Sequence, residues 1–216
     1  ETPPGIPPRH GSLTEEMAQQ LEAAFGFGTG NTLYRPNMTL IDFNSFVDYL
    51  ILEELTANID AYRKSTYLHI DHRGVVVAGP IWDFDSALGN AYPSLEYSLL
   101  WTQPTWCSTS IANVYQAFFG NKSHWEIVIR RWHSLRRGVF SDTALRSHVQ
   151  RISRSLLASG AVDRNFATWP WMDYPVFWAG TSCSNSSSAE MQCLADWLVQ
   201  RAAFLDTVFW SGEEVS

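Results

Sequence analysis

The sequence predicts a mainly α-helical domain with one small β-hairpin, an α+β fold. Apolar residues recur at helical spacing in most of the chain. Two short runs of β-type residues, 66–70 and 75–79, flank a turn. The chain has 216 residues, 45% of them hydrophobic, which is enough for the core of one domain. The segments with helical spacing are 13–24, 42–55, 125–135, 145–156 and 194–208.

Composition excludes several classes of protein. The 22 acidic and 15 basic residues give a net charge of −7, which argues against a nucleic-acid binder. No apolar run is long enough to cross a bilayer, so no membrane span is expected. The 10 Trp, 12 Phe and 8 Tyr exclude a disordered chain.

We expect a single domain over residues 12–210. Residues 1–11 are rich in proline and predict an extended connector, and residues 211–216 form a tail. The first residues are neither an initiator nor a signal peptide, so we expect a processed or truncated chain.

Start and stop residues place the first elements. The capping box Ser12–Glu15 predicts the start of a helix, and Gly26 predicts its end. Thr39–Asp42 opens a second helix whose apolar stripe runs to about Leu55. Then the period changes, and Asp71–Gly74 predicts the turn of a hairpin.

The second half of the chain is helical again. The capping box Ser123–Glu126 predicts the start of a helix that stops at Gly138. The next helix ends at Gly160, and the last one contains residues 194–208. The hairpin is therefore an insert in a helical body.

The segment around the hairpin carries the candidate chemistry. Asp60 is followed five residues later by Ser65, and the hairpin is followed by Asp83-Phe84-Asp85. A loop aspartate, a hairpin and then an Asp-Phe pair is the order of parts in a protein-kinase C-lobe, with D-x-x-x-x-N and D-F-G patterns. The alternative is that Asp60 caps a turn and the second run is a loop with buried aromatic residues.

Phosphoryl transfer explains why these residue types occur together. It needs a carboxylate to orient the acceptor hydroxyl and oxygen ligands for Mg²⁺. Asp83 and Asp85 lie two apart, so in an extended segment they point to one side and share a cation site. Ser65 offers a hydroxyl where kinases use an asparagine amide.

Longer blocks resemble the spore-coat protein H (CotH) family of atypical kinases. The central ones are Ile41-Asp42-x-x-Ser45-Phe46, Glu54-Leu55-Thr56-x-Asn58-x-Asp60-Ala61-Tyr62-Arg63-x-Ser65-Thr66-Tyr67 and Gly79-Pro80-x-Trp82-Asp83-Phe84-Asp85. With the helical tail, the resemblance covers residues 40 to 205 in sequence order.

The resemblance implies a kinase that uses ATP and Mg²⁺ or Mn²⁺ to phosphorylate Ser or Thr of extracellular or coat proteins. It gives Asp60 the role of the catalytic-loop aspartate and Asp83 that of the metal-binding aspartate. Asp85 supports the metal, and Ser65 supports the cofactor.

One departure is the missing N-lobe. No strand pattern precedes residue 40, and neither lysine, Lys64 or Lys122, precedes Asp60. The glycines between Gly26 and Gly30 follow a helix, which favours a helix stop over a nucleotide loop. We expect a C-lobe whose N-lobe was cut away, lies on a partner chain or was lost.

Two functions therefore stay open. The first is the C-lobe of a secreted kinase, completed by an upstream lobe or a partner chain. The second is a non-catalytic, kinase-like component of an extracellular coat or filament.

Cysteines and glycosylation sequons predict secretion. Cys183 and Cys193 enclose a Ser/Asn-rich loop and predict a disulfide, with Cys107 left free or paired to another chain. The sequons at Asn37, Asn121 and Asn185 would accept glycans in a secretory pathway. The alternative is a cytosolic protein with free thiols.

Overall fold

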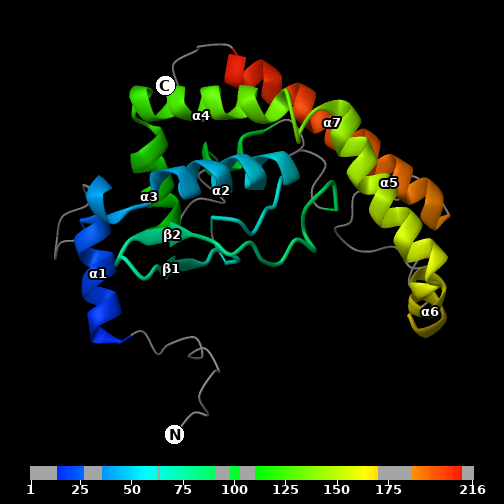
Figure 1. Cartoon of the computed structure of the whole chain (residues 1–216), viewed down its shortest axis with the longest axis horizontal. Coiled ribbons are helices and arrows are strands. Elements are labelled where there is room, and N and C mark those ends of the chain that lie inside the picture. Colours follow the sequence, from blue (N-terminus) through cyan, green and yellow to red (C-terminus); the bar gives the residue numbers. More distant parts are fainter. Residues whose placement is uncertain are drawn as a thin grey trace, which may run out of the picture.

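A computed structural model describes residues 14–26, 36–62, 64–90, 98–102, 110–169 and 186–210. These residues form helices and one two-stranded antiparallel sheet, which confirms the α+β expectation. Helix α2 (Phe43–Thr56) lies at the centre, between α4 (Lys122–Arg136) on one side and the hairpin on the other (Figure 1). The predicted connector 1–11 and tail 211–216 lie outside the described residues.

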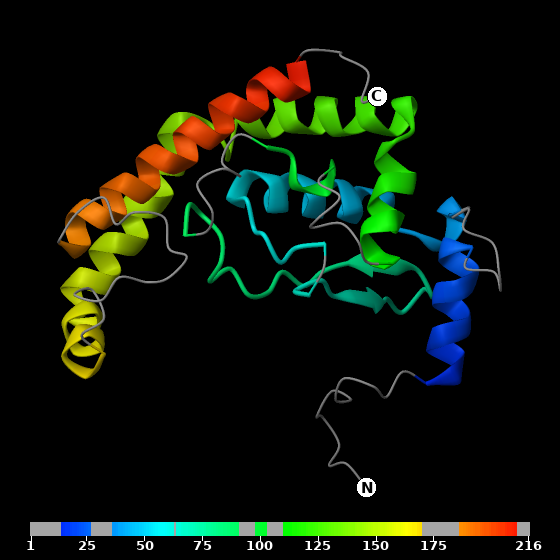
Figure 2. The same ribbon diagram turned by 180° about the vertical axis from the view of Figure 1, so that it is seen from behind.

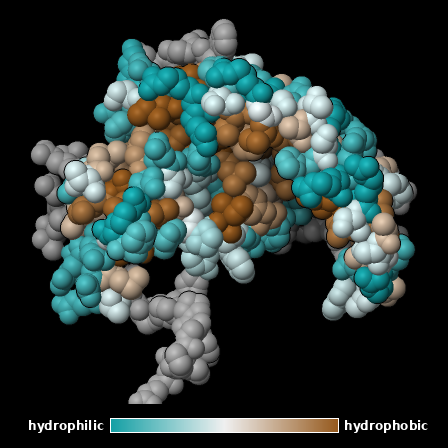
Figure 3. All heavy atoms as spheres, in the orientation of Figure 1, coloured by the Kyte–Doolittle hydropathy of each residue, from teal (hydrophilic) through white to brown (hydrophobic). Residues whose placement is uncertain are grey.

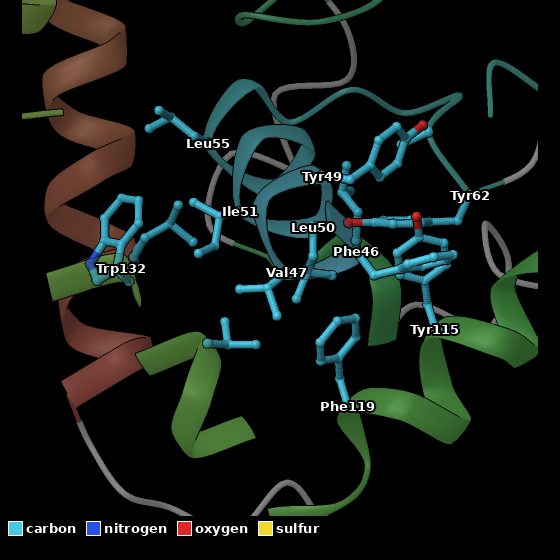
Figure 4. Packing of buried hydrophobic residues seen from close by; sticks show 14 of the residues in the cluster. Phe46, Val47, Tyr49, Leu50, Ile51, Leu55, Tyr62, Tyr115, Phe119 and Trp132 are labelled. Carbon is cyan, nitrogen blue, oxygen red and sulfur yellow. The ribbon is translucent and has the colours of Figure 1, made fainter. Parts of the chain in front are cut away.

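The core surrounds α2. Phe46, Leu50 and Ile51 are completely buried, each stabilising the fold by roughly 1.5–3 kcal/mol. Figure 4 shows these side chains between the aromatic rings of α3 (Ser110–Phe119) on one side and Trp132 of α4 on the other. Because neighbours cover α2 on several sides, this helix is apolar around most of its circumference rather than along one stripe.

Two helices begin at other residues than the sequence predicts. Helix α1 (Glu15–Phe25) is capped by Thr14, whose side chain accepts from the Met17 N–H, rather than by Ser12. Helix α4 begins at Lys122 because Asn121, not Ser123, is its N-cap and accepts from the Ser123 N–H at 3.0 Å. Thr and Asn are also good N-caps, so a Ser-x-x-Glu pattern alone does not fix the first residue.

The hairpin consists of β1 (Leu68–Ile70) and β2 (Val76–Ala78), with Leu68 opposite Ala78. It is tied to the start of α2 at two points. The Asp42 N–H donates to the Val76 carbonyl, and the Ala78 N–H donates to Ser45 Oγ, both at 2.9 Å. These bonds fix the loops before and after the hairpin relative to α2.

The remaining helices form an arm. Helix α5 (Asp142–Ala158) runs beside α7 (Ser187–Trp210), with the short α6 (Ala161–Thr168) at the far end, as both views show (Figures 1 and 2). The C-terminal half of α7 leaves α5 and packs on α2 and α4, where Leu205 is buried. Short 3-10 turns lie at Met38–Leu40 and Leu100–Thr102. Among the described helices, none combines the length and apolarity needed to span a membrane.

Candidate active site

A buried asparagine joins the two loops that carry the candidate aspartates. Helix α2 ends at Thr56, and Ala57 turns the chain with a left-handed backbone (φ 48°). Asn58 then lies fully buried. Its Oδ1 accepts from the Asp60 N–H at 3.1 Å, and its Nδ2 donates to the Asp83 carbonyl at 3.4 Å. One amide thus holds segments that lie 25 residues apart.

Ser65 makes a second tie between the same loops. Its N–H donates to the Asp60 carbonyl at 3.1 Å, and its hydroxyl donates to Asp83 Oδ2 at 3.2 Å. The Tyr49 hydroxyl of α2 donates to the Ser65 carbonyl at 3.3 Å. Ser65 is only 3% exposed, so its hydroxyl orients the Asp83 carboxylate from the buried side and does not project into solvent. The structure therefore brings Asp60, Ser65 and Asp83 together.

The backbone at Asp83 differs from the extended segment that the sequence suggested. Asp83 has φ 64°, a left-handed conformation that costs energy for a residue with a Cβ. The expectation that Asp83 and Asp85 point to one side was therefore wrong, because it requires an extended chain. Both residues are exposed, and the Asp85 carbonyl accepts from Asn90 Nδ2 at 2.7 Å. The ties from Asn58 and Ser65 hold Asp83 in this conformation.

Asp60 is more sheltered than Asp83. Its side chain is 17% exposed, and its carboxylate lies 3.6 Å from the ammonium of Lys64, one turn further along the chain. The site therefore presents one shielded carboxylate with a cation beside it and one open carboxylate.

A buried ion pair, which the sequence did not indicate, supports this site from α7. Arg201 lies 3.3 Å from Glu54 Oε2, and both side chains are almost completely buried. The guanidinium also donates to the Glu54 carbonyl at 2.8 Å, and the Tyr62 hydroxyl donates to Glu54 Oε1 at 3.0 Å. Glu54 thus links α2, the Asp60 loop and α7. An acidic residue inside an apolar run was the available sequence clue.

Glu53, the neighbour of Glu54, is buried without such partners. Its exposure is 0%, and neither carboxyl oxygen has a hydrogen-bond partner among the described residues. Burial raises the pKa of Glu53 to about 8, although the polar side chains of Tyr49 and Asn58 act in the opposite direction. The raised pKa favours the neutral carboxyl at pH 7, next to the amide that joins the two loops.

The oxygen donors at this site suit Mg²⁺ or Mn²⁺. A hard divalent cation bound to phosphates commonly uses one or two carboxylates of the protein, and Asp83 and Asp85 supply two exposed ones. The described residues contain no group of three or more His, Cys, Asp or Glu side chains that would hold a metal by themselves. Exposed carboxylates of this kind suit a cation that a phosphorylated ligand also binds, rather than a closed protein site.

The other predicted sites lie partly outside the described residues. Cys107, Cys183 and Asn185 fall there, so the disulfide between Cys183 and Cys193 stays a prediction. Cys193 lies in α7. Asn37 and Asn121 are both described, and both are exposed.

The fold and the site together define a helical α+β protein in which a hairpin joins two aspartate-bearing loops. The family model described as CotH kinase protein matches residues 8–205. The chain therefore belongs to the CotH kinase protein family, as its motifs predicted. No curated protein and no solved structure matches the chain.

Proposed function

We propose that this chain is the C-terminal lobe of a secreted, CotH-type protein kinase that transfers the γ-phosphate of ATP to Ser or Thr of extracellular or coat proteins. The observation that carries the proposal is the double tie between the Asp60 and Asp83 loops through Asn58 and Ser65. Family membership supports the same reaction class.

Each residue has a defined task in this proposal. Asp60 accepts a hydrogen bond from the acceptor hydroxyl and orients it, and its sheltered position limits competition by water. Asp83 and Asp85 would hold Mg²⁺ or Mn²⁺, which supplies charge neutralisation for the ATP phosphates. Ser65 positions Asp83, because its hydroxyl is bonded to that carboxylate. An upstream lobe or a partner chain would cover the nucleotide.

The alternative proposal is a non-catalytic component of an extracellular coat or filament. The serine at position 65 favours it, because kinases use an asparagine amide at this point of the catalytic loop to hold a metal ion.

The first test is metal binding by the chain itself. We expect weak binding of Mn²⁺, measured by the loss of its free EPR spectrum, and a decrease of about tenfold for Asp83→Asn. Asp163→Asn is the matched control, since Asp163 is an exposed aspartate on α6. Equal binding by both variants would contradict the assignment of Asp83 as a metal ligand.

The second test is phosphate transfer by the full-length natural protein that contains this sequence. Labelled ATP, Mn²⁺ and a Ser/Thr peptide library should give labelled peptides, and Asp60→Asn should reduce the rate by at least ~100-fold. Asp163→Asn should leave the rate unchanged. If the wild-type protein transfers no phosphate, the enzymatic proposal fails and the structural one replaces it.

A further inference from the structure

A pocket lies between α5 and α7, on residues that take no part in the Asp60–Asp83 site. Its volume is about 270 Å³. Val149 of α5 and Met191 of α7 give it an apolar wall, and the other lining residues are polar. Hydrophilic residues cover most of the arm on the face shown in Figure 3. This volume is below the roughly 300–1,000 Å³ of pockets for drug-sized ligands, so the pocket suits a single side chain or a small group.

Ser153 contributes a hydroxyl that has no hydrogen-bond partner among the described residues. The residue lines the pocket and is only 9% exposed. Its hydroxyl makes no hydrogen bond to any of the described residues, unlike the buried hydroxyls of Ser65 and Thr56. The hydroxyl is not one of the fully buried unpaired atoms of the described residues, so it is reached from the pocket and is open to a hydrogen bond with a ligand.

Arg154 contributes an uncompensated positive charge. Its Nε donates to the Gln150 carbonyl at 3.3 Å, and its guanidinium forms no ion pair within the described part of the chain. Arg154 lines the same pocket as Ser153. Arg154 is exposed, so its guanidinium is free to turn toward the pocket, where its charge favours an anion.

The acidic residues near the pocket do not cancel this charge. Asp196 of α7 pairs with Arg146 of α5 and accepts from Gln192 at 3.4 Å. The hydrogen bond from Arg146 lowers the pKa of Asp196, so the carboxylate stays ionised and paired. Glu190 lies two residues after Ser188, about 200° around the helix from it, and so does not share its face.

Ser188 brings the first turn of α7 to the same pocket. The amino end of a helix carries a partial positive charge that attracts anions. An arginine, two serine hydroxyls and a helix start therefore surround one small space.

We propose that this pocket binds the phosphoryl group of a phosphorylated Ser or Thr side chain in a peptide. Arg154 would pair with the dianion, Ser153 and Ser188 would donate to its oxygens, and Val149 and Met191 would contact the aliphatic stem. The inference that such peptides reach the pocket rests on the proposed function, because a Ser/Thr kinase produces them. The pocket would then retain a substrate that has been phosphorylated once.

The test compares a fluorescent peptide carrying one phosphoserine with the same peptide carrying serine, by anisotropy with the full chain. We expect the phosphopeptide to bind at least about tenfold more tightly, and Arg154→Gln to remove about tenfold of its affinity. Ser153→Ala should weaken binding by a few fold. Inorganic phosphate should compete with the phosphopeptide at millimolar concentration.

Arg151→Gln is the matched control. Arg151 lies on the same helix, next to His148, and does not line the pocket, so its loss should change the affinity less than twofold. Circular dichroism should show that each variant is folded. Equal binding of the two peptides, equal losses for Arg154→Gln and Arg151→Gln, or displacement by ATP at the concentration of the phosphopeptide would each overturn the proposal.

The result is independent of catalysis. The phosphopeptide is supplied ready-made, and Asp60→Asn should bind it as tightly as the wild type does. A protein that transfers no phosphate but binds the phosphopeptide would fail only the proposed function. A kinase that does not bind the phosphopeptide would fail only this inference.

Discussion

At the scale of single residues, the contrast between Glu53 and Glu54 shows how partners decide the state of a buried carboxyl. Glu54 accepts from a tyrosine hydroxyl and pairs with Arg201, so burial is compatible with its charge. Glu53 has no hydrogen-bond partner among the described residues, and burial therefore favours its neutral form. Neighbouring positions on α2 thus place the same residue type in two different environments, one paired with a cation and one dominated by burial.

This contrast predicts that the stability of the protein depends on pH. Burial raises the pKa of Glu53 to about 8 in the folded state, above its ordinary value of about 4.5. The unfolded chain therefore releases this proton first, and the free energy of unfolding should fall by roughly 3 kcal/mol between pH 5 and pH 8. Urea unfolding at several pH values measures the fall.

Glu53→Gln is the matching variant, because it keeps the size of the side chain and cannot ionise. Its stability should change much less across the same range, and it should exceed that of the wild type at pH 8. A wild-type stability that stays constant from pH 5 to pH 8 would show that Glu53 ionises normally.

At the scale of elements, the Glu54–Arg201 pair joins α2 to α7 across 147 residues of sequence. Arg201→Met leaves the Glu54 carboxylate buried without its cation, so we expect a loss of about 3–5 kcal/mol in urea unfolding. Glu54→Gln in the same chain should restore part of that loss, since it removes the uncompensated charge.

An exposed ion pair provides the control for this experiment. Arg131 Nε lies 2.7 Å from Asp48 Oδ1. This pair joins α4 to α2, and both of its side chains are close to half exposed. Arg131→Met should therefore cost less than ~1 kcal/mol. Equal losses for Arg131→Met and Arg201→Met would mean that burial does not control the strength of these pairs.

The elements that the sequence predicted are those that local patterns of apolar and turn residues specify. The second helix and the hairpin follow from apolar spacing and turn residues, and Asp42, the last residue of the predicted start Thr39–Asp42, is the N-cap of α2. Helix α6 was not predicted, since its eight residues are short and none is buried. Helix α7 begins at Ser187, inside the serine tract that the sequence suggested as a loop.

The candidate site was predicted only in part, because local sequence patterns do not reveal partners that are distant in the chain. The motifs indicated Asp60, Ser65 and Asp83, and the structure brings them together. Their roles stay predictions. Arg201 was missed because its partner lies 147 residues away, where no periodicity in the sequence reaches it.

At the scale of the whole molecule, the body, which is the part packed around α2, differs in chemistry from the arm of α5, α6 and α7. The body presents the exposed carboxylates Asp83 and Asp85, whereas the arm carries Arg154, which forms no ion pair among the described residues. Under the proposed function, a cation and ATP would bind to the body, and a phosphorylated peptide would bind to the arm. Separate surfaces of opposite charge would keep the two ligands apart.

Secretion, which remains a proposal, predicts that Asn37 and Asn121 carry glycans. Both are exposed helix caps whose Oδ1 accepts from the hydroxyl two residues on, at 2.7 Å in each case. The cap uses only Oδ1 and makes no use of Nδ2, the atom to which a glycan attaches, so modification is compatible with the folded structure. Peptide mapping of the secreted natural protein, with and without enzymatic removal of N-glycans, should show at least one of them modified.

The variant Ser123→Ala separates glycosylation from capping. It abolishes the sequon at Asn121 but keeps the bond from the residue 123 N–H to Asn121 Oδ1, which has a length of 3.0 Å. The glycan at Asn121 should therefore disappear while stability changes by less than ~1 kcal/mol. Asn121→Ala should lose both the glycan and the cap, at a cost of about 1 kcal/mol. Native protein in which Asn37, Asn121 and Asn185 are all bare would remove the main support for secretion.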